Sequence, residues 1–221
     1  ENGVFIVSAE SFVFYAKTII LAIGLVPRHL NVPGETLFIG KGISYCANCD
    51  GPLYKNKNVA VIGGGNSALD AAELMSKIAK NVYLIHRYDK FQAFEKIVEK
   101  VNKAECIKIY FNNEVKEILG DKKVGSIKIV NISDKTESIL PVDGIFIEVG
   151  HEAKTDLIKD LVKIDGKGQI VIDEKGSTSQ EGIFAAGDAT TVPYKQIVTA
   201  CGQGAIAALS AYQYLQLQQN S

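Results

Sequence analysis

The sequence predicts an α/β protein with two related domains, between which the chain crosses twice. One observation is a short apolar strand, Asn58–Ile62, which runs into a glycine-rich turn and then into a helical pattern, the order found in a βαβ unit. The other is an apolar run ending in glycine, which occurs at residues 17–24, 144–150 and 182–187. Because such repetition indicates related domains, we place the crossings near Val26 and Gly150.

Composition and charge exclude several classes of protein. Hydrophobic residues make up 47% of the 221-residue chain and charged residues 22%, as in ordinary globular proteins. The net charge of −1 offers no basic surface for nucleic acid. The longest apolar run, residues 18–26, is far shorter than the ~20 residues of a membrane span, so no membrane association is expected. The opening Glu1-Asn2-Gly3 lacks the pattern of a signal peptide, and together with the few cysteines this favours a cytoplasmic location.

The N-terminal part of the chain is predicted to contain strands and a connection. Residues 4–7 and 12–15 are β-rich and predict a hairpin. The continuous apolar run 17–24 is typical of a strand buried on both faces. Residues 27–42 are rich in Pro and Gly and are predicted to form a connecting segment.

The middle of the chain alternates helix and strand. After the strand at Asn58–Ile62, spacings of three and four between apolar residues predict a helix over residues 66–80. A strand over 81–86 and a second helix over 91–103 follow. Four further strands alternate polar and apolar residues and predict an antiparallel flap. These lie near residues 107–111, 114–118, 126–131 and 138–141, and are followed by a strand at 169–172 and a closing helix over about 196–216.

The turn Gly63-x-Gly65-x-x-Ala68 opens the first predicted helix and has the form of a dinucleotide-binding motif. Gly63 permits a tight turn, Gly65 lets a diphosphate approach the backbone, and the small Ala68 lets the helix pack closely on the strand. The free N–H groups of the helix N-terminus favour an anion. The flanking strand and helix make the motif more specific than its glycines alone, and they predict a Rossmann-like domain with Asn66 and Ser67 at the cofactor.

The end of the second predicted strand bears on which dinucleotide is bound. It reads His86-Arg87-Tyr88-Asp89-Lys90. An acidic residue at this place would bind the 2′-hydroxyl of NADH, whereas an arginine would bind the 2′-phosphate of NADPH. The strand end itself has no acidic residue and Arg87 is available, which favours NADPH. The alternative is that Arg87 is a solvated surface residue.

A Cys-x-x-Cys motif lies at Cys46 and Cys49, with Asp50 directly behind it. A structural zinc site needs about four ligands, and the sequence has no second such pair, so no metal site is expected. Inert packing is a further alternative. A redox pair is favoured, because such motifs lower a thiol pKa and the thiolate is the attacking species. Asp50 either transfers a proton as the disulfide opens or only forms a turn. The other two cysteines, Cys106 and Cys201, are interpreted as small buried residues.

Together these motifs resemble the low-molecular-weight thioredoxin reductase family. The resemblance rests on residues 44–51, residues 63–68, His86-Arg87 and residues 182–188, in one order over nearly the whole chain. The flavoprotein subunit of alkyl hydroperoxide reductase is a close relative, most clearly over residues 49–53 and 189–196.

The resemblance implies an FAD-binding domain split in sequence, residues 1–26 and 151–221, into which an NAD(P)H-binding domain, residues 27–150, is inserted. It implies that Asp188 binds the ribityl chain of the flavin, that Cys49 faces the flavin and that Cys46 attacks the disulfide of the protein substrate. It further implies a homodimer and a swivel between the domains with hinges near both crossings. Lys195, Gln196 and Ile197 are implied to lie along the flavin. The candidate cofactor-binding residues of the whole chain are Gly63, Gly65, Asn66, Ser67, Ala68, His86, Arg87, Gly150, Gly187, Asp188, Lys195, Gln196 and Ile197.

Two departures from the family pattern change these expectations. The family usually has two adjacent arginines after the histidine and a third a few residues on, whereas these positions read Arg87, Tyr88 and Gln92. NADH therefore stands beside NADPH as an option. The family's first glycine-rich turn, which holds the FAD diphosphate, is absent from residues 1–26. The N-terminal part of the FAD-binding domain is thus expected to be missing from this chain, which by itself is not expected to hold FAD tightly.

The expected function is that of a flavoprotein disulfide reductase. Electrons would pass from NAD(P)H through FAD and the Cys46/Cys49 dithiol to a thioredoxin-like protein disulfide. One alternative keeps this chemistry with another acceptor, as an NADH-dependent reductase that serves a peroxidase in an alkyl hydroperoxide reductase system. The other alternative is an isolated dinucleotide-binding fragment without turnover.

Overall fold

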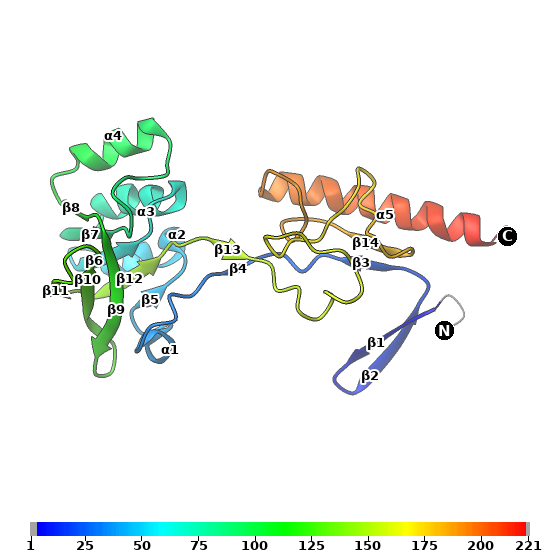
Figure 1. Ribbon diagram of the computed structural model, residues 1–221, viewed down its shortest axis with the longest axis horizontal. Helices are drawn as coiled ribbons and strands as arrows, with labels where there is room; N and C mark the ends of the chain where they lie inside the picture. The colour runs from blue at the N-terminus through cyan, green and yellow to red at the C-terminus, as the bar shows by residue number, and fades with distance from the viewer. Residues whose placement is uncertain (1–3, 220–221) are drawn as a thin grey trace. The chain divides into compact units, whose positions relative to one another are not determined.

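A computed structural model describes residues 4–219 and divides the chain into two compact units (Figure 1). The inserted unit is Pro27–Gly150. The flanking unit combines Glu1–Val26 with His151–Ser221. Each unit has its own buried apolar clusters, and each is described by itself below.

The inserted unit is built on a five-stranded parallel sheet. Because the strands are parallel, their carboxyl ends lie at one edge of the sheet, where ligands of such folds bind. The order across the sheet is β5 (Ile43–Ser44), β12 (Gly144–Ile147), β6 (Asn58–Ile62), β7 (Asn81–Ile85) and β8 (Ile107–Tyr110).

Both faces of this sheet are covered, which explains its continuous apolar strands. Helices α3 (Asn66–Ser76) and α4 (Glu95–Lys103) cover one face, and the antiparallel sheet β9 (Asn113–Gly120), β10 (Val124–Asn131) and β11 (Glu137–Pro141) covers the other (Figure 1). Side chains alternate between the faces along a strand. In β6, accordingly, Val59 and Val61 belong to the cluster under the helices and Ala60 and Ile62 to the cluster under the antiparallel sheet.

Three predicted elements of this unit differ from the structure. The sequence pattern assigns residues 107–111 to the antiparallel flap, but β8 pairs in parallel with β7, because α4 returns the chain across the face of the sheet. Helix α4 begins at Glu95 rather than at residue 91. The N–H of Gln92 donates to the carbonyl of Gly64 (2.8 Å), and the N–H of Phe94 donates to Asn66 Oδ1 (2.8 Å). These bonds hold residues 92–94 beside the glycine turn and outside the helix. Helix α3 ends at Ser76 instead of residue 80.

The connection from Pro27 to β6 contains three short helical segments. These are α1 (Glu35–Phe38), α2 (Ala47–Asp50) and a 3₁₀ turn, Gly51–Tyr54. At the crossings, β4 (Val26–Pro27) pairs with β13 (His151–Glu152), and the N–H of Arg28 donates to the carbonyl of Gly150 (2.9 Å). The two crossing segments therefore run side by side.

In the flanking unit, β1 (Phe5–Ala9) and β2 (Phe12–Ala16) form the predicted hairpin, and β3 (Ile19–Leu21) pairs in parallel with β14 (Ile183–Ala185). The long helix α5 (Ile197–Gln219) lies along β14 (Figure 1). Residues 183 and 185 of β14 face one apolar cluster, while Phe184 contacts the cluster that includes Ala207 of α5.

Three expectations for the flanking unit were wrong. The strand β3 is not buried on both faces: Ile20 is 42% exposed, and among residues 4–219 β14 is the one strand that pairs with it. Residues 169–172 form isolated bridges through Ile170 instead of a strand. Cys201 lies on an exposed face of α5. Within the part of the chain that the structure describes, no helix has the length and apolarity needed to cross a membrane.

Candidate active site

A cavity of about 630 Å³ lies at the carboxyl edge of the five-stranded sheet, within the inserted unit. It is bounded by the turn after β6, by the residues that follow β7 and β12, and by the start of β9. The cavity brings together seven of the predicted cofactor residues, which come from three separate segments of the chain. They are Gly63, Gly65, Asn66, Ser67, His86, Arg87 and Gly150.

The three glycines of the turn have different reasons to be glycine. Gly63 has φ +142°, and a Cβ there would lie 2.3 Å from the carbonyl oxygen of Glu148. At Gly64 a Cβ would lie 2.2 Å from the ring of His86. Gly65 differs, because its φ of −91° suits any residue and the nearest atom to its Cβ position is 3.9 Å away. The fold itself thus requires glycine at 63 and 64 but has room for a side chain at 65.

The N-terminus of α3 opens at this turn. Gly65 is the N-cap residue and supplies no side-chain hydrogen bond to the first turn of the 11-residue helix. The first N–H groups of such a helix lack partners within it and carry partial positive charge. Behind the turn, Ala68 is fully buried. A Cβ atom added at Gly63 would lie only 2.8 Å from the Cβ of Ala68, so the two residues are in close contact. The small side chains let α3 begin close to the sheet, so its N–H groups can bind an anion.

The residues after β7 divide into a buried histidine and exposed polar groups. The His86 ring packs against Gly64, stacks on Phe91 and lies with Nε2 3.0 Å from the carbonyl oxygen of Lys90. Burial lowers the pKa of His86, an effect that this hydrogen bond partly offsets, so His86 supports the turn as a neutral ring. Arg87 is exposed, with its guanidinium 4.9 Å from the centre of the Tyr88 ring, a cation–π contact.

The two motif cysteines are joined in a disulfide, Cys46–Cys49, with 5.3 Å between their Cα atoms. They bracket the start of α2, and one residue, Tyr45, separates Cys46 from the end of β5. Ser44 accepts a hydrogen bond from the N–H of Cys46 (3.0 Å), and its hydroxyl donates to Asp50 Oδ2 (2.6 Å). Ser44 therefore holds the carboxylate of Asp50 beside the segment that carries the disulfide.

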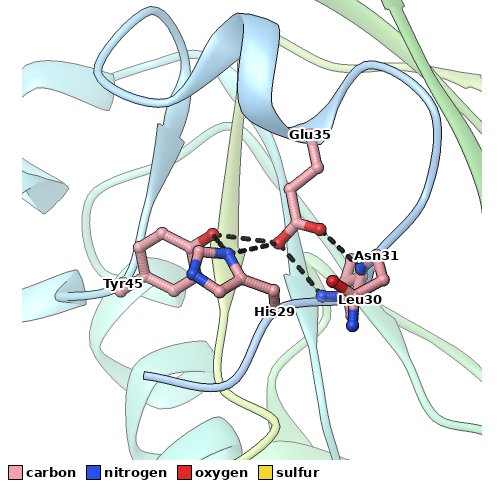
Figure 2. A network of polar contacts seen from close by, with 5 residues as sticks. All are labelled: His29, Leu30, Asn31, Glu35 and Tyr45. Carbon is pink, nitrogen blue, oxygen red and sulfur yellow. Dashed lines mark hydrogen bonds and ion pairs between the residues drawn. The ribbon is translucent and has the colours of Figure 1, made fainter. Parts of the chain in front are cut away.

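A buried carboxylate anchors the residue before Cys46 to the first crossing segment (Figure 2). Glu35 is 2% exposed and accepts hydrogen bonds from the N–H of Leu30 (3.0 Å), the N–H of Asn31 (2.7 Å) and the hydroxyl of Tyr45 (2.9 Å). His29 Nδ1 lies 2.7 Å from that hydroxyl. Burial and the Glu35 carboxylate raise the pKa of Tyr45, so Tyr45 remains a hydrogen-bond donor. The network fixes the start of the disulfide segment against residues 29–31.

The remaining predicted cofactor residues lie in the flanking unit. Gly187 has φ +81° and donates its N–H to the side chain of Gln203 in α5 (2.8 Å). Lys195 Nζ donates to the carbonyl of Thr190 (2.5 Å). Burial lowers the pKa of Lys195, and the charge of Asp188 opposes this shift. Gln196 and Ile197 are exposed at the start of α5.

The comparison with known families gives the decisive observation. The family model of pyridine nucleotide-disulphide oxidoreductases matches residues 3–204. The chain belongs to this family. The thioredoxin reductase of Listeria innocua is 42% identical over 211 residues, which cover 95% of this chain and 66% of that protein. In Xanthomonas campestris pv. phaseoli, the F subunit of alkyl hydroperoxide reductase is 41% identical over 201 residues, which cover 90% of this chain and 38% of that protein.

Solved structures agree with this assignment. The Lactococcus lactis thioredoxin reductase in its FR conformation superposes with a TM-score of 0.85 at 36% identity, covering 97% of this chain and 71% of that one. These comparisons confirm the predicted resemblance to thioredoxin reductases. They also confirm the predicted α/β fold. The chain spans 38% to 66% of the length of the two curated relatives described above.

Two acidic residues of the candidate site were missed by the sequence analysis. Glu35 lies in a segment predicted only as a connection; it is buried, and it accepts a hydrogen bond from Tyr45, which follows β5. Glu148 follows the apolar strand β12 and lines the cavity. A charged residue at the carboxyl end of a buried strand is the signal that could have identified Glu148.

Proposed function

We propose that this chain contributes the nicotinamide dinucleotide site and the redox-active dithiol of a flavoprotein that reduces a thioredoxin-like protein disulfide. One observation carries the proposal: a disulfide follows β5 and a dinucleotide turn follows β6 of the same parallel sheet, with one strand between them. Relatives named thioredoxin reductase support the choice of acceptor.

The inserted unit fits a dinucleotide. The cavity of about 630 Å³ at the strand ends has the N-terminus of α3 at one wall, where a diphosphate is stabilised by N–H groups and the helix dipole. The glycine at position 65 supports this use, because the surrounding protein leaves room for a side chain there. A diphosphate approaching the backbone would fill that room.

The dithiol chemistry follows from Cys46, Cys49 and Asp50. In the reduced pair, the thiolate of Cys46 attacks the substrate disulfide, forming a mixed disulfide and releasing one substrate thiolate. Cys49 then attacks Cys46, which restores the Cys46–Cys49 bond and releases the second substrate thiolate. Asp50, held by Ser44 at 2.6 Å, is the group proposed to exchange protons with these sulfur atoms.

The flanking unit is proposed to hold the flavin. When bound, a flavin links two-electron hydride chemistry to thiol–disulfide chemistry. The residues proposed for this role precede or begin α5. They are the polar residues Asp188, Lys195 and Gln196, and Ile197, whose side chain is 83% exposed. They offer both hydrogen-bonding groups and an uncovered apolar surface, the combination that a ring with a polar tail needs.

The test has two parts. Calorimetric titration of the 221-residue chain with NADH and NADPH is expected to give a dissociation constant of about 10⁻⁶–10⁻⁴ M for at least one of them. The natural protein that contains this chain, supplied with FAD, is expected to oxidise NADH or NADPH continuously when a thioredoxin disulfide is supplied, and much more slowly when no electron acceptor is supplied. Absence of dinucleotide binding would contradict the proposal. Binding without disulfide reduction by the natural protein would favour a binding fragment instead.

A peroxidase is the second candidate acceptor, because the Xanthomonas relative at 41% identity belongs to an alkyl hydroperoxide reductase. The two acceptors are distinguished by comparing kcat/KM for thioredoxin and for the disulfide form of a peroxidase. Faster reduction of the peroxidase would assign the chain to an alkyl hydroperoxide reductase system. The proposed dithiol chemistry would be the same.

Weak discrimination between NADPH and NADH is expected. Arg87, Tyr88 and Gln92 all line the cavity, and only Arg87 is cationic. A charge-assisted contact contributes roughly 1.5–3 kcal/mol, or about 10- to 100-fold in affinity. The double substitution Tyr88→Arg with Gln92→Arg is therefore expected to raise the preference for NADPH by at least about 10-fold, measured as the ratio of the two kcat/KM values.

The control is Arg87→Gln, which should lower NADPH affinity and leave NADH affinity nearly unchanged. If the unmodified protein already prefers NADPH by more than about 10³-fold, other residues hold the 2′-phosphate, and the explanation from these three positions is incorrect.

A further inference from the structure

Glu148 lies between the dinucleotide turn and the disulfide segment. It directly follows β12, and its half-buried side chain lines the cavity. Its N–H donates to the carbonyl of Ile62 at the end of β6 (2.8 Å). Its carboxyl group accepts a hydrogen bond from the N–H of Ala47, the residue after Cys46. Glu148 thus lines the cavity of the dinucleotide turn and also contacts the segment that carries the disulfide.

The strand order indicates which half of a dinucleotide meets Glu148. In folds of this kind the diphosphate lies on the first glycine turn, and the adenosine ribose lies at the end of the next strand. Here these are the turn after β6 and the end of β7. The nicotinamide half must then extend to the other side of β6, over the end of β12. Glu148 stands at that end. This step rests on the proposed function.

We propose that Glu148 distinguishes the two oxidation states of the nicotinamide, and that its ionised carboxylate favours the oxidised form. The reduced ring is neutral, whereas the oxidised ring carries a positive charge. A carboxylate beside the ring attracts the cation and has no comparable attraction for the neutral ring. The rest of the two cofactor forms is the same, so the difference in their affinities isolates this contact.

The protonation of Glu148 makes this preference depend on pH. Burial raises the pKa of Glu148 to about 7, although the hydrogen bond from Ala47 opposes the shift. Below that pH the carboxyl group is neutral and should not discriminate, and above it the carboxylate should favour the oxidised ring. By linkage, the oxidised cofactor favours loss of the proton from Glu148 and the reduced cofactor does not.

The ionisable groups on the proposed adenosine side of the cavity should act on both cofactor forms alike. Arg87 and His86 lie at the end of β7, the proposed adenosine side, and Glu114 lies beside them, because the N–H of Asn113 donates to the carbonyl of His86 (3.1 Å). Because the two cofactor forms are identical in their adenosine half, these groups should affect the affinities for NAD⁺ and NADH together and leave the ratio unchanged. The ionisable residues that line the cavity besides Glu148 are Arg28, His29, His86, Arg87, Tyr88 and Glu114.

The experiment measures the dissociation constants of NAD⁺ and NADH for the 221-residue chain at pH 5.5 and pH 8.5. For the unmodified chain, the ratio of the NADH constant to the NAD⁺ constant is expected to rise by about 10-fold between these pH values, which corresponds to a coupling of one pKa unit. Glu148→Gln keeps the size of the side chain and an acceptor for Ala47, and it should make the ratio independent of pH. Glu114→Gln is the matched control and should keep the rise.

Two results would overturn the proposal: a ratio that does not change with pH in the unmodified chain, or a rise that persists in Glu148→Gln. Glu148→Asp retains the charge, so it should retain part of the rise in the ratio. It provides a second test of the proposal if the Glu148→Gln variant folds poorly. If neither cofactor binds the unmodified chain, the proposed dinucleotide site is incorrect, and the proposed role of Glu148 is rejected together with it. Normal binding with an unchanged ratio rejects the role of Glu148 alone.

Discussion

Replacing Cys46 or Cys49 with serine, in the natural protein that contains this chain and with its flavin bound, is expected to reduce thioredoxin reduction by about 10³-fold or more. A hydroxyl group can neither accept two electrons as a disulfide nor attack as a thiolate at neutral pH. The observed Cys46–Cys49 disulfide is the proposed store of these electrons. The measurement is the rate of NAD(P)H oxidation with a thioredoxin disulfide as acceptor.

Two controls separate loss of the dithiol from loss of the protein. Reduction of a dye directly by the flavin bypasses the cysteines and should largely survive in both variants. Cys106→Ser should keep full activity, because Cys106 lies outside the site and its thiol only donates a hydrogen bond to the carbonyl of Ser76 (3.4 Å), which serine can also make. Full disulfide-reductase activity in Cys46→Ser or Cys49→Ser would show that electrons leave the protein by another route.

Gly65→Val is expected to weaken dinucleotide binding by about 100-fold while the chain remains folded. The protein has room for a side chain at this position, where φ is −91° and the nearest atom to a Cβ is 3.9 Å away. The valine would occupy the space through which the diphosphate reaches the N-terminus of α3. Loss of two charge-assisted hydrogen bonds, each about 1.5 kcal/mol, corresponds to roughly 100-fold in affinity. Calorimetric titration with NADH and NADPH measures the effect.

Thermal unfolding supplies the contrast for this prediction. Gly64→Ala should lower the melting temperature, because its Cβ would lie 2.2 Å from the buried His86 ring. Gly65→Val should change the melting temperature little, since an apolar N-cap costs about 1 kcal/mol. Gly125→Val, at an exposed glycine of β10 with its nearest neighbour at 3.8 Å, should leave binding unchanged. Unaltered dinucleotide affinity in Gly65→Val would place the diphosphate elsewhere.

The sequence by itself was sufficient for features that neighbouring residues encode. The strand Asn58–Ile62 is predicted with its observed bounds, because a short apolar run bounded by polar residues and a glycine turn is a local pattern. The start of α3 at Asn66 follows from the same turn. The disulfide partners Cys46 and Cys49 are three residues apart, so their chemistry also depends on local sequence.

The tertiary structure decided which strands pair and how deeply each lies. The alternating pattern of residues 107–111 suits either an antiparallel flap or the edge of a parallel sheet, and the choice of β7 as partner is non-local. The burial of β3 was also decided by tertiary structure. Its apolar residues indicate a fully buried strand, although Ile20 is 42% exposed. Burial depends on what covers a strand, and its own residues do not specify this.

The late start of α4 and the roles of two acidic residues were likewise decided by distant contacts. Residues 92–94 fit a helical pattern, but hydrogen bonds to Gly64 and Asn66 hold them outside the helix. Glu35 and Glu148 are ordinary acidic residues in the sequence. They become site residues because folding places the first against Tyr45 and the second between Ile62 and Ala47. Desolvation of a carboxyl group depends on the groups that surround it in space, and the order of residues along the chain does not show those surroundings.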